Sequence, residues 1–233
     1  MASNVVIAFD LDDTLYKERD YVLNAYLKIL QRYAGEVCRA SENCDFGEFA
    51  KNEDVISLCQ NFLAHEKPYE AFEYLSAHLP GTDVEEMKAI YRSGDIPLKD
   101  TEGARDTLAY LKDKGYTTAI ITDGFSQRQR RKITELGIEH LIDHILISEE
   151  TGYDKTSAIP FRRLQEKCPD AKRFVYIGDN PAKDFYHPNT MGWDTVMIFD
   201  AARRNIHPQN LRLPQSYLAH TSLMALSYLK NVF

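Results

Sequence analysis

The stretch Val5-Val6-Ile7-Ala8-Phe9-Asp10-Leu11-Asp12-Asp13-Thr14 decides the fold of this chain. Its first half is apolar and partly β-branched, as is typical of a buried strand in a parallel sheet. Its second half brings three carboxylates and a hydroxyl to the end of that strand. Their desolvation is costly unless a metal ion, a fixed cation or a chemical role offsets it. Because open α/β sheets place their active sites at the carboxyl ends of strands, we expect the active site here.

Further strand-like runs follow, and helical patterns fill most of the intervals between them. The predicted strands are Val5–Phe9, Thr117–Ile121, His144–Ile147, Phe174–Ile177 and Thr195–Phe199, with a late candidate at Tyr217–Ala219. The predicted helices of this part are Gly103–Lys114, Gln127–Leu136, Ser157–Lys167 and Leu223–Val232. Alternating strands and helices predict βαβ units with right-handed crossovers. The expected class is therefore α/β, with a Rossmann-like parallel sheet core flanked by helices.

One long stretch, from Tyr16 to Pro97, has helical periodicity and no convincing strand. It predicts the amphipathic helices Tyr21–Tyr33, Phe46–Leu63, Tyr69–His78 and Val84–Tyr91. A stretch of about eighty residues suffices for a small domain. We expect an α/β core of residues 1–15 and 98–233, with residues 16–97 inserted as an all-helical cap over the strand ends. The alternative is that these helices belong to one larger core.

Bulk composition limits the classes of partner. The chain has 233 residues and a formal net charge of −7, which argues against nucleic acid or an anionic membrane as the main partner. A small anionic substrate stays compatible, because local cations decide its binding. Neither a C-x-x-C pair nor an N-terminal run long enough for a signal peptide or membrane span occurs, which favours reduced cysteines and a cytoplasmic location. The cysteines are Cys38, Cys44, Cys59 and Cys168. Monomer and homodimer both stay open.

Asp10 and Asp12 lie two residues apart at the first strand end. In an extended chain, residues i and i+2 point to the same side, so the two carboxylates converge. Such a pair can divide the roles of nucleophile and general acid/base. The alternatives are a purely metal-binding role and a helix cap.

Thr122-Asp123-Gly124 ends the second core strand and precedes a predicted helix. A hydroxyl followed by glycine in front of a helix presents side-chain and backbone donors to a phosphate. A plain helix cap is an equally good interpretation of these three residues alone.

Asp179 and Asp184 follow a later strand, and Lys155 lies in a loop before another predicted helix. Mg²⁺ takes one or two carboxylates together with carbonyl, water and phosphate oxygens, so Asp10 and Asp179 from neighbouring strand ends would supply a site for it. A single loop lysine is usually only solvated, so Lys155 gains its significance from the other motifs.

In this order, the motifs resemble those of haloacid dehalogenase (HAD) superfamily hydrolases, and among them phosphatases with a helical cap of the first class (C1). The resemblance implies that Asp10 is the nucleophile that forms an aspartyl-phosphate. It implies that Asp12 protonates the leaving oxygen, later activates water and offers its backbone carbonyl to the metal. Thr122 and nearby backbone N–H groups would bind the phosphoryl oxygens, and Lys155 would neutralise charge.

The resemblance also implies that Asp179 binds Mg²⁺ and that Asp184 supports the metal or Lys155. Two positions depart from the common pattern, since Thr156 stands where proline is frequent and Asp13 where glycine is frequent. The segment Thr122–Phe125 with Gln127, Arg128 and Lys132 is similar to the pyrimidine nucleotidase and N-acylneuraminate-9-phosphatase branches.

The expected function is Mg²⁺-dependent hydrolysis of a small phosphorylated metabolite, a nucleotide or a sugar phosphate. The candidate substrate-binding residues are Thr122, Asp123, Gly124, Lys155 and Arg19, and the candidate metal ligands are Asp10, Asp12, Asp179 and Asp184. A phosphomutase stays open as an alternative. A dehalogenase is disfavoured because a halide needs no proton from Asp12. A non-catalytic phosphometabolite-binding protein is disfavoured because every motif residue is retained.

Two other patterns are assigned no function. The basic cluster Arg128, Arg130, Arg131 and Lys132 is interpreted as the solvated face of a helix in an acidic protein. His140 and His144 lack the H-E-x-x-H pattern of a zinc site.

Overall fold

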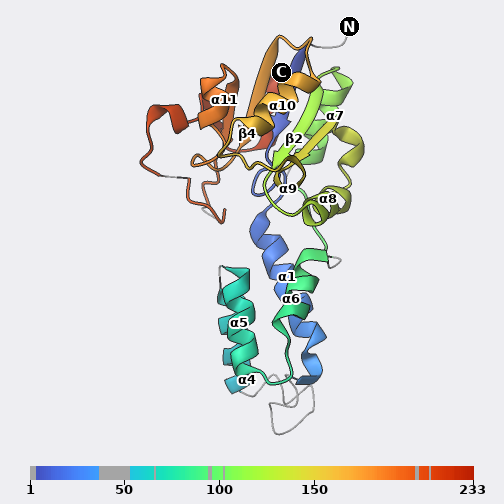
Figure 1. Ribbon diagram of the computed structural model, residues 1–233, viewed down its shortest axis with the longest axis vertical. Coiled ribbons are helices and arrows are strands. Elements are labelled where there is room, and N and C mark those ends of the chain that lie inside the picture. The colour runs from blue at the N-terminus through green and yellow to red at the C-terminus, as the bar shows by residue number, and fades with distance from the viewer. Residues whose placement is uncertain are drawn as a thin grey trace. The chain divides into compact units, whose positions relative to one another are not determined.

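A computed structural model describes residues 4–36, 53–65, 67–93, 96–101, 103–202, 205–209 and 211–233. The described parts of residues 1–19 and 98–233 form one compact unit, and those of residues 20–97 form another (Figure 1). The first is the α/β unit and the second is the helical unit. Among the described residues, no helix is both long and apolar enough to cross a bilayer.

Six parallel strands form one sheet within the described part of the α/β unit, in the order β3-β2-β1-β4-β5-β6. The strands are β1 (Val5–Phe9), β2 (Thr117–Thr122), β3 (His144–Ile147), β4 (Arg173–Gly178), β5 (Asp194–Ile198) and β6 (Thr221–Leu223). The chain runs outward from β1 through β2 to β3, and then returns to the other side of β1 to add β4, β5 and β6. The predicted parallel α/β class is confirmed.

Both faces of the central strand are buried, which explains why its sequence is continuously apolar rather than alternating. Val6 and Ala8 belong to a core cluster that includes Phe161 of helix α10 (Ile159–Lys167). Ile7 and Phe9 point to the opposite face and have no exposed surface. Burial on both faces leaves the carboxyl end of β1 as the place where its following polar residues emerge.

The described helices of the α/β unit are α7 (Ala104–Asp113), α8 (Ser126–Glu135), α9 (Ser148–Thr151), α10 (Ile159–Lys167) and α11 (Tyr186–Thr190), with 3₁₀ helices η1 (Glu139–Leu141), η2 (Gln215–Tyr217) and η3 (Leu226–Asn231). Three of the four helices predicted for the α/β unit are confirmed, as α7, α8 and α10. Gly115 and Gly137 follow the ends of α7 and α8 with φ of 80° and 64°, a conformation that glycine adopts without strain.

Two predictions near the C-terminus are wrong. The last strand is β6 rather than Tyr217–Ala219, and η2 covers the start of the predicted strand. The predicted helix Leu223–Val232 is instead the short η3, because Leu223 pairs with Ile198 of β5 and belongs to the sheet. Both errors have the same cause, because the pairing of β6 with β5 determines where the last strand lies. The local periodicity of the sequence does not show which strands pair.

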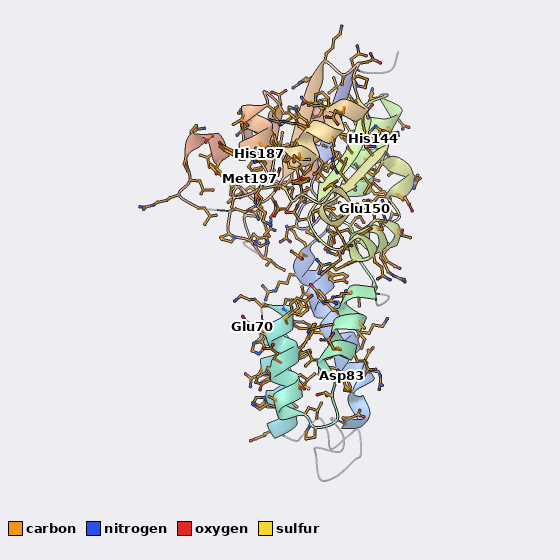
Figure 2. All side chains as sticks on the ribbon, viewed as in Figure 1. Glu70, Asp83, His144, Glu150, His187 and Met197 are labelled. Carbon is orange, nitrogen blue, oxygen red and sulfur yellow. The ribbon has the colours of Figure 1, made fainter. Side chains whose placement is uncertain are left out.

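The helical unit contains α4 (Glu53–Ala64), α5 (Pro68–His78), α6 (Val84–Ser93) and most of α1 (Glu18–Arg32). Its centre is aromatic, since the Tyr26 ring centroid lies 4.7 Å from that of Phe62 and 6.1 Å from that of Phe72. Figure 2 shows the side chains, with Glu70 and Asp83 labelled in this unit. Residues 46–52 of the predicted helix Phe46–Leu63, like Cys38 and Cys44, lie outside the described residues. Cys59 and Cys168 are free.

Candidate active site

The candidate site lies where β1 and β4 end side by side. Phe9 pairs with Ile177, and the Asp10 N–H donates to the Ile177 carbonyl at 2.8 Å. The strand order reverses direction between β1 and β4, and such a switch point leaves a crevice at the carboxyl ends of the strands. Asp10 and Asp179 enter this crevice from the two adjacent strands, as predicted, and are 4% and 2% exposed.

A cavity of about 250 Å³ occupies this crevice. It brings together six of the residues predicted from sequence, namely Asp10, Asp12, Asp123, Gly124, Lys155 and Asp179. Glu18, Arg128 and His207 also line it, and the sequence had not marked Glu18 or His207 as site residues.

Lys155 is the cation at the centre of the site. Its Nζ lies 2.6 Å from Asp10 Oδ1 and 2.7 Å from Asp184 Oδ1, and the residue is 4% exposed. Burial alone would lower the pKa of Lys155, but the Asp10 and Asp184 carboxylates raise it well above its usual range. The ammonium therefore stays charged next to the candidate nucleophile.

Carboxylate oxygens of Asp10, Asp179 and Asp184 lie within 4.8 Å of one another. Burial raises the pKa of Asp10 and of Asp179, and the Asp184 carboxylate raises both further, although Lys155 opposes the rise. One ammonium cannot balance three buried carboxylates, so the group has the donor chemistry and the excess negative charge that suit a hard divalent cation.

Asp184 binds the backbone that follows the end of β4. Its Oδ2 accepts the backbone N–H groups of Asp179 and Asn180 at 3.1 and 2.8 Å. A Cβ on Gly178 would lie 2.7 Å from Asp184 Cγ, so only glycine fits at this position. Asp184 thus fixes the turn that carries Asp179, and its other oxygen contacts Lys155.

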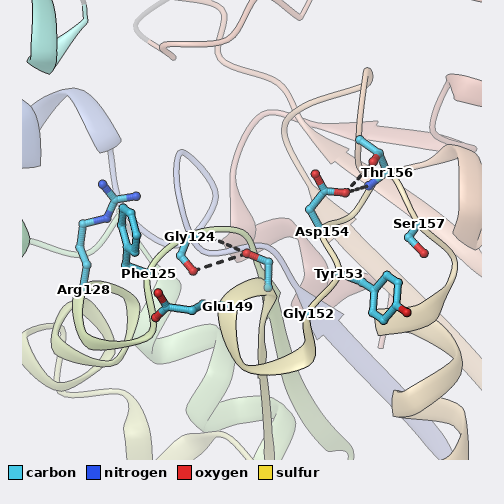
Figure 3. A pocket seen from close by; sticks show the side chains of 10 residues that line it. Gly124, Phe125, Arg128, Glu149, Gly152, Tyr153, Asp154, Thr156 and Ser157 are labelled. Carbon is cyan, nitrogen blue, oxygen red and sulfur yellow. Dashed lines mark hydrogen bonds between the residues drawn. The ribbon is translucent and has the colours of Figure 1, made fainter.

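Of the residues at the end of β2, Asp123 and Gly124 line the cavity, and many of the polar groups of this segment already make hydrogen bonds. Thr122 is 1% exposed, and Asp123 accepts the Lys155 N–H at 3.0 Å and the Lys183 ammonium at 3.2 Å. The Gly124 N–H donates to Ser148 Oγ at 2.8 Å (Figure 3). These contacts connect the end of β2 to the loop carrying Lys155 and to α9. Their predicted part in substrate binding stays a prediction.

Two of the predicted substrate-binding residues, Thr122 and Arg19, do not line the cavity. Thr122 is buried and hydrogen-bonded to Gln129. Arg19 is exposed on α1.

Asp12 is held by donors that the sequence analysis had not assigned to the site. Lys132 Nζ lies 2.5 Å from its Oδ1, and the Tyr16 hydroxyl donates to the same oxygen. Gln129 Nε2 donates to Asp12 Oδ2 and to Thr122 Oγ1, both at 2.7 Å. Burial would raise the pKa of Asp12, but Lys132 and Tyr16 hold it at about 2. In the ligand-free site these donors therefore favour the ionised form of Asp12.

The interpretation of the basic cluster as a solvated face is wrong for Lys132, which is 1% exposed. Arg130 is exposed and pairs with Glu150, and Arg131 is partly exposed and pairs with Glu135. The usable signal was the spacing of Gln129 and Lys132, because residues i and i+3 share one face of a helix. That face of α8 is turned inward.

Glu18 is a further ionisable residue of the cavity wall. Burial, and then the nearby Asp12 carboxylate, raise the pKa of Glu18 to about 7. Its charge therefore changes near neutral pH, unlike that of an ordinary surface glutamate.

Comparison with known proteins agrees with this geometry. Residues 5–185 match the haloacid dehalogenase-like hydrolases, and the chain belongs to this family. Divalent metals are generally used in the family, in keeping with the carboxylate group described above.

Individual relatives extend this result. Glyceraldehyde 3-phosphate phosphatase of Pyrococcus furiosus is 30% identical over 197 residues, which cover 82% of this chain and 79% of that protein. Ribulose-1,5-bisphosphate 5-phosphatase of Halopiger xanaduensis is 27% identical over 210 residues, covering 85% and 86%. The magnesium-bound HAD hydrolase YfnB of Bacillus subtilis shares the fold with a TM-score of 0.66 and 18% identity, covering 100% of this chain and 99% of that structure.

Proposed function

We propose that this protein is a Mg²⁺-dependent phosphomonoesterase that works through an aspartyl-phosphate on Asp10. The observation that carries the proposal is the buried Asp10 carboxylate at the strand switch point, in contact with the Lys155 ammonium. Phosphoryl transfer depends mainly on positioning and on neutralising charge. Buried and in contact with a fixed cation, Asp10 meets both demands.

In the first step, an Asp10 oxygen attacks phosphorus and the bond from phosphorus to the leaving oxygen breaks. Asp12, which must be protonated at this point, gives its proton to the leaving alkoxide and becomes ionised. In the second step, water attacks the phosphorus, Asp12 accepts the water's proton, and phosphate leaves with Asp10 restored. The donors on Asp12 favour its ionised form, which suits it to the proton-accepting role in this second step.

The metal ligands in this proposal are Asp10, Asp179 and the backbone carbonyl of Asp12, with Asp184 as a support. When bound, Mg²⁺ supplies positive charge to the phosphoryl oxygens. The chain itself keeps Asp10 and Asp179 close together through Asp184 and Lys155, so the carboxylates need little rearrangement to receive the ion.

We propose a phosphorylated sugar as the substrate class. Support comes from the names of the relatives, which are phosphatases of glyceraldehyde 3-phosphate and of ribulose 1,5-bisphosphate. The second candidate class is nucleotides, because the segment Thr122–Lys132 is similar to the pyrimidine nucleotidase branch. We also propose that the helical unit is a cap of the first class, in accord with its insertion between β1 and β2 in the chain.

The test is turnover by the purified protein against a panel of sugar phosphates, nucleotides and acetyl phosphate, with Mg²⁺ and with EDTA. Asp10→Asn keeps the shape of the side chain and removes its nucleophilicity, so activity should fall by several orders of magnitude. The control is Asp194→Asn, which alters a half-exposed carboxylate paired with Arg173 at the start of β5 and should leave turnover near that of the parent. Equal activity of the two variants would refute the covalent mechanism.

The same panel separates the rival reactions. A phosphomutase would return an isomeric sugar phosphate and little inorganic phosphate, whereas a phosphatase releases phosphate in step with substrate loss. A dehalogenase would release halide from a 2-haloacid and leave the phosphate panel untouched.

A further inference from the structure

The segment Asn205–Gln209 follows β5 and lies beyond residue 185, where the match to the family ends. Three of its five residues make hydrogen bonds to the ends of β1 and β4, the two strands that carry the candidate catalytic carboxylates. We name these three residues, Asn205, Ile206 and Gln209, the brace.

Asn205 contacts the predicted metal ligand directly. Its Oδ1 accepts a hydrogen bond from Lys17 Nζ at 2.6 Å, and its Nδ2 donates to Asp179 Oδ2 at 2.9 Å. An ammonium only donates and an ionised carboxylate only accepts, so these two neighbours determine the orientation of the amide. With Oδ2 held by Asn205, the carboxylate of Asp179 is fixed in rotation, and its other oxygen stays available to a cation.

The other brace residues bind main-chain and side-chain groups on both sides of the crevice. Gln209 Nε2 donates to the Asp179 carbonyl at 3.0 Å and to the Ile198 carbonyl at 2.7 Å. The Ile206 N–H donates to Asp13 Oδ2 at 2.7 Å. Asp13 follows Asp12 directly, so the brace connects the two strand ends that form the site.

His207 lies between the brace residues and lines the cavity of Asp10, Asp12 and Lys155. Its residue is exposed, and no hydrogen bond or ion pair to its imidazole occurs within the described part of the chain. An imidazole held at the wall of a catalytic cavity, with both nitrogens available, can donate to or accept from a polar group of a ligand. Ile206 on one side and Gln209 on the other limit how far the residue can move away.

We propose that the segment Asn205–Gln209 completes the active site: Asn205 positions Asp179 for the metal, and His207 binds the polar leaving group of the substrate. This inference rests on the proposed phosphatase function. The leaving group that His207 fits is a carbon chain that carries several hydroxyl groups or a second phosphate. The oxygens of such a chain can form hydrogen bonds with the imidazole. Asn205 is a positioning residue, because it acts through Asp179.

The first experiment measures Mg²⁺ binding by calorimetry without substrate. Loss of a hydrogen-bond partner of a metal ligand commonly costs 10–100-fold in metal affinity, so Asn205→Ala should weaken Mg²⁺ binding by roughly tenfold or more. The matched control is Asn189→Ala, since the Asn189 amide binds Thr195 and the carbonyls of Ser216 and Leu218 instead. Equal Mg²⁺ affinities of the two variants would overturn the positioning role.

The second experiment compares KM and kcat for the best sugar phosphate with those for acetyl phosphate, whose leaving group carries no hydroxyl. His207→Ala should raise KM for the sugar phosphate about tenfold, the factor that corresponds to loss of a typical hydrogen bond. The constants for acetyl phosphate should change less than twofold. His220→Ala is the control, because His220 is also exposed and its hydrogen bond to Thr195 comes from the backbone N–H, which the substitution keeps.

The outcomes separate this inference from the proposed function. A parent protein that hydrolyses acetyl phosphate, together with a His207→Ala variant whose KM values match those of the parent on both substrates, overturns the role of His207 alone. A parent protein inactive on the whole panel refutes the phosphatase proposal and the leaving-group role of His207 with it. The calorimetry on Asn205→Ala still decides the positioning of Asp179 in that case.

Discussion

Replacement of Lys132 by methionine tests the ion pair between Lys132 and Asp12. Methionine retains much of the volume and the unbranched apolar stem of lysine, so packing around the buried side chain is largely conserved. The substitution removes the ammonium that lies 2.5 Å from Asp12 Oδ1. Asp12 then keeps the burial that disfavours its charge and loses the cation that most strongly lowers its pKa.

The expected loss of stability follows from the pKa of Asp12. A fall from the ordinary value of 3.8 to about 2 corresponds to about 2 kcal/mol of preferential stabilisation of the ionised form. Breaking a buried ion pair typically costs about 3–5 kcal/mol of unfolding free energy. Because the Asp12 side chain is 19% exposed, water partly solvates its carboxylate, and we expect a cost at or below the lower end of this range. We therefore expect Lys132→Met to lower the free energy of unfolding by about 2–3 kcal/mol at pH 7.

The measurement is urea denaturation of the metal-free protein, in which this loss shifts the midpoint by roughly 1 M. Because the folded-state pKa of Asp12 is depressed, its contribution is present above pH 4 and is lost as the pH falls towards 2, so the deficit should shrink over that range. Arg131→Met is the control, because Arg131 is the neighbouring residue of the same helix and its side chain is 41% exposed. Its ion pair with Glu135, at 3.5 Å, contributes about 0–1 kcal/mol, so this variant should lose less stability. A common midpoint for both variants would refute the reasoning.

Three further predictions concern the same cavity. The parent protein should lose about 2 kcal/mol of unfolding free energy between pH 5 and pH 8 that the Glu18→Gln variant keeps, because the stability contributed by the raised pKa of Glu18 is present below pH 4.5 and lost as the pH rises through 7. Denaturant titrations at both pH values measure this, and a difference between variant and parent that does not change with pH would contradict it. Gly178→Ala should destabilise by about 1–3 kcal/mol, since its Cβ would overlap the buried Asp184 carboxylate, and an unchanged melting curve would show that the turn relaxes. Mg²⁺ affinity measured by calorimetry should rise with pH and be accompanied by proton release, because Asp10 and Asp179 have raised pKa values; identical affinities at pH 5 and pH 8 would count against their role as ligands.

The strand that carries Asp10 could be predicted because its signals are local. A buried parallel strand is apolar at every position, and acidic residues that follow it directly emerge at its carboxyl end. The same reasoning brought Asp179 to the neighbouring strand end, where the structure has it. The parallel pairing of β1 with β4 was the one long-range assumption, and it followed from the alternation of strands and helices.

The contacts around Asp12 and Asp179 could not be predicted in this way. The spacing of Gln129 and Lys132 places the two residues on one face of α8. Tertiary packing decides that this face, within a run of basic residues, is the one turned inward. Asn205 and His207 lie in an irregular segment without periodicity, so their places depend on hydrogen bonds to strands far away in the chain. The late strand was misplaced for a related reason, since β6 depends on its pairing with β5.

The pairing of Val5 with Arg173 has a consequence for how the protein is made. During synthesis the first strand leaves the ribosome with its acidic end, and the whole helical unit follows before any partner strand of the sheet appears. β2 can pair with one edge of β1, but the other edge stays unpaired until β4, which ends at residue 178, has emerged. Long-range parallel pairing is slow to form and exposes unpaired strand edges meanwhile. The centre of the sheet and the carboxylate group at its end are therefore completed only late in synthesis.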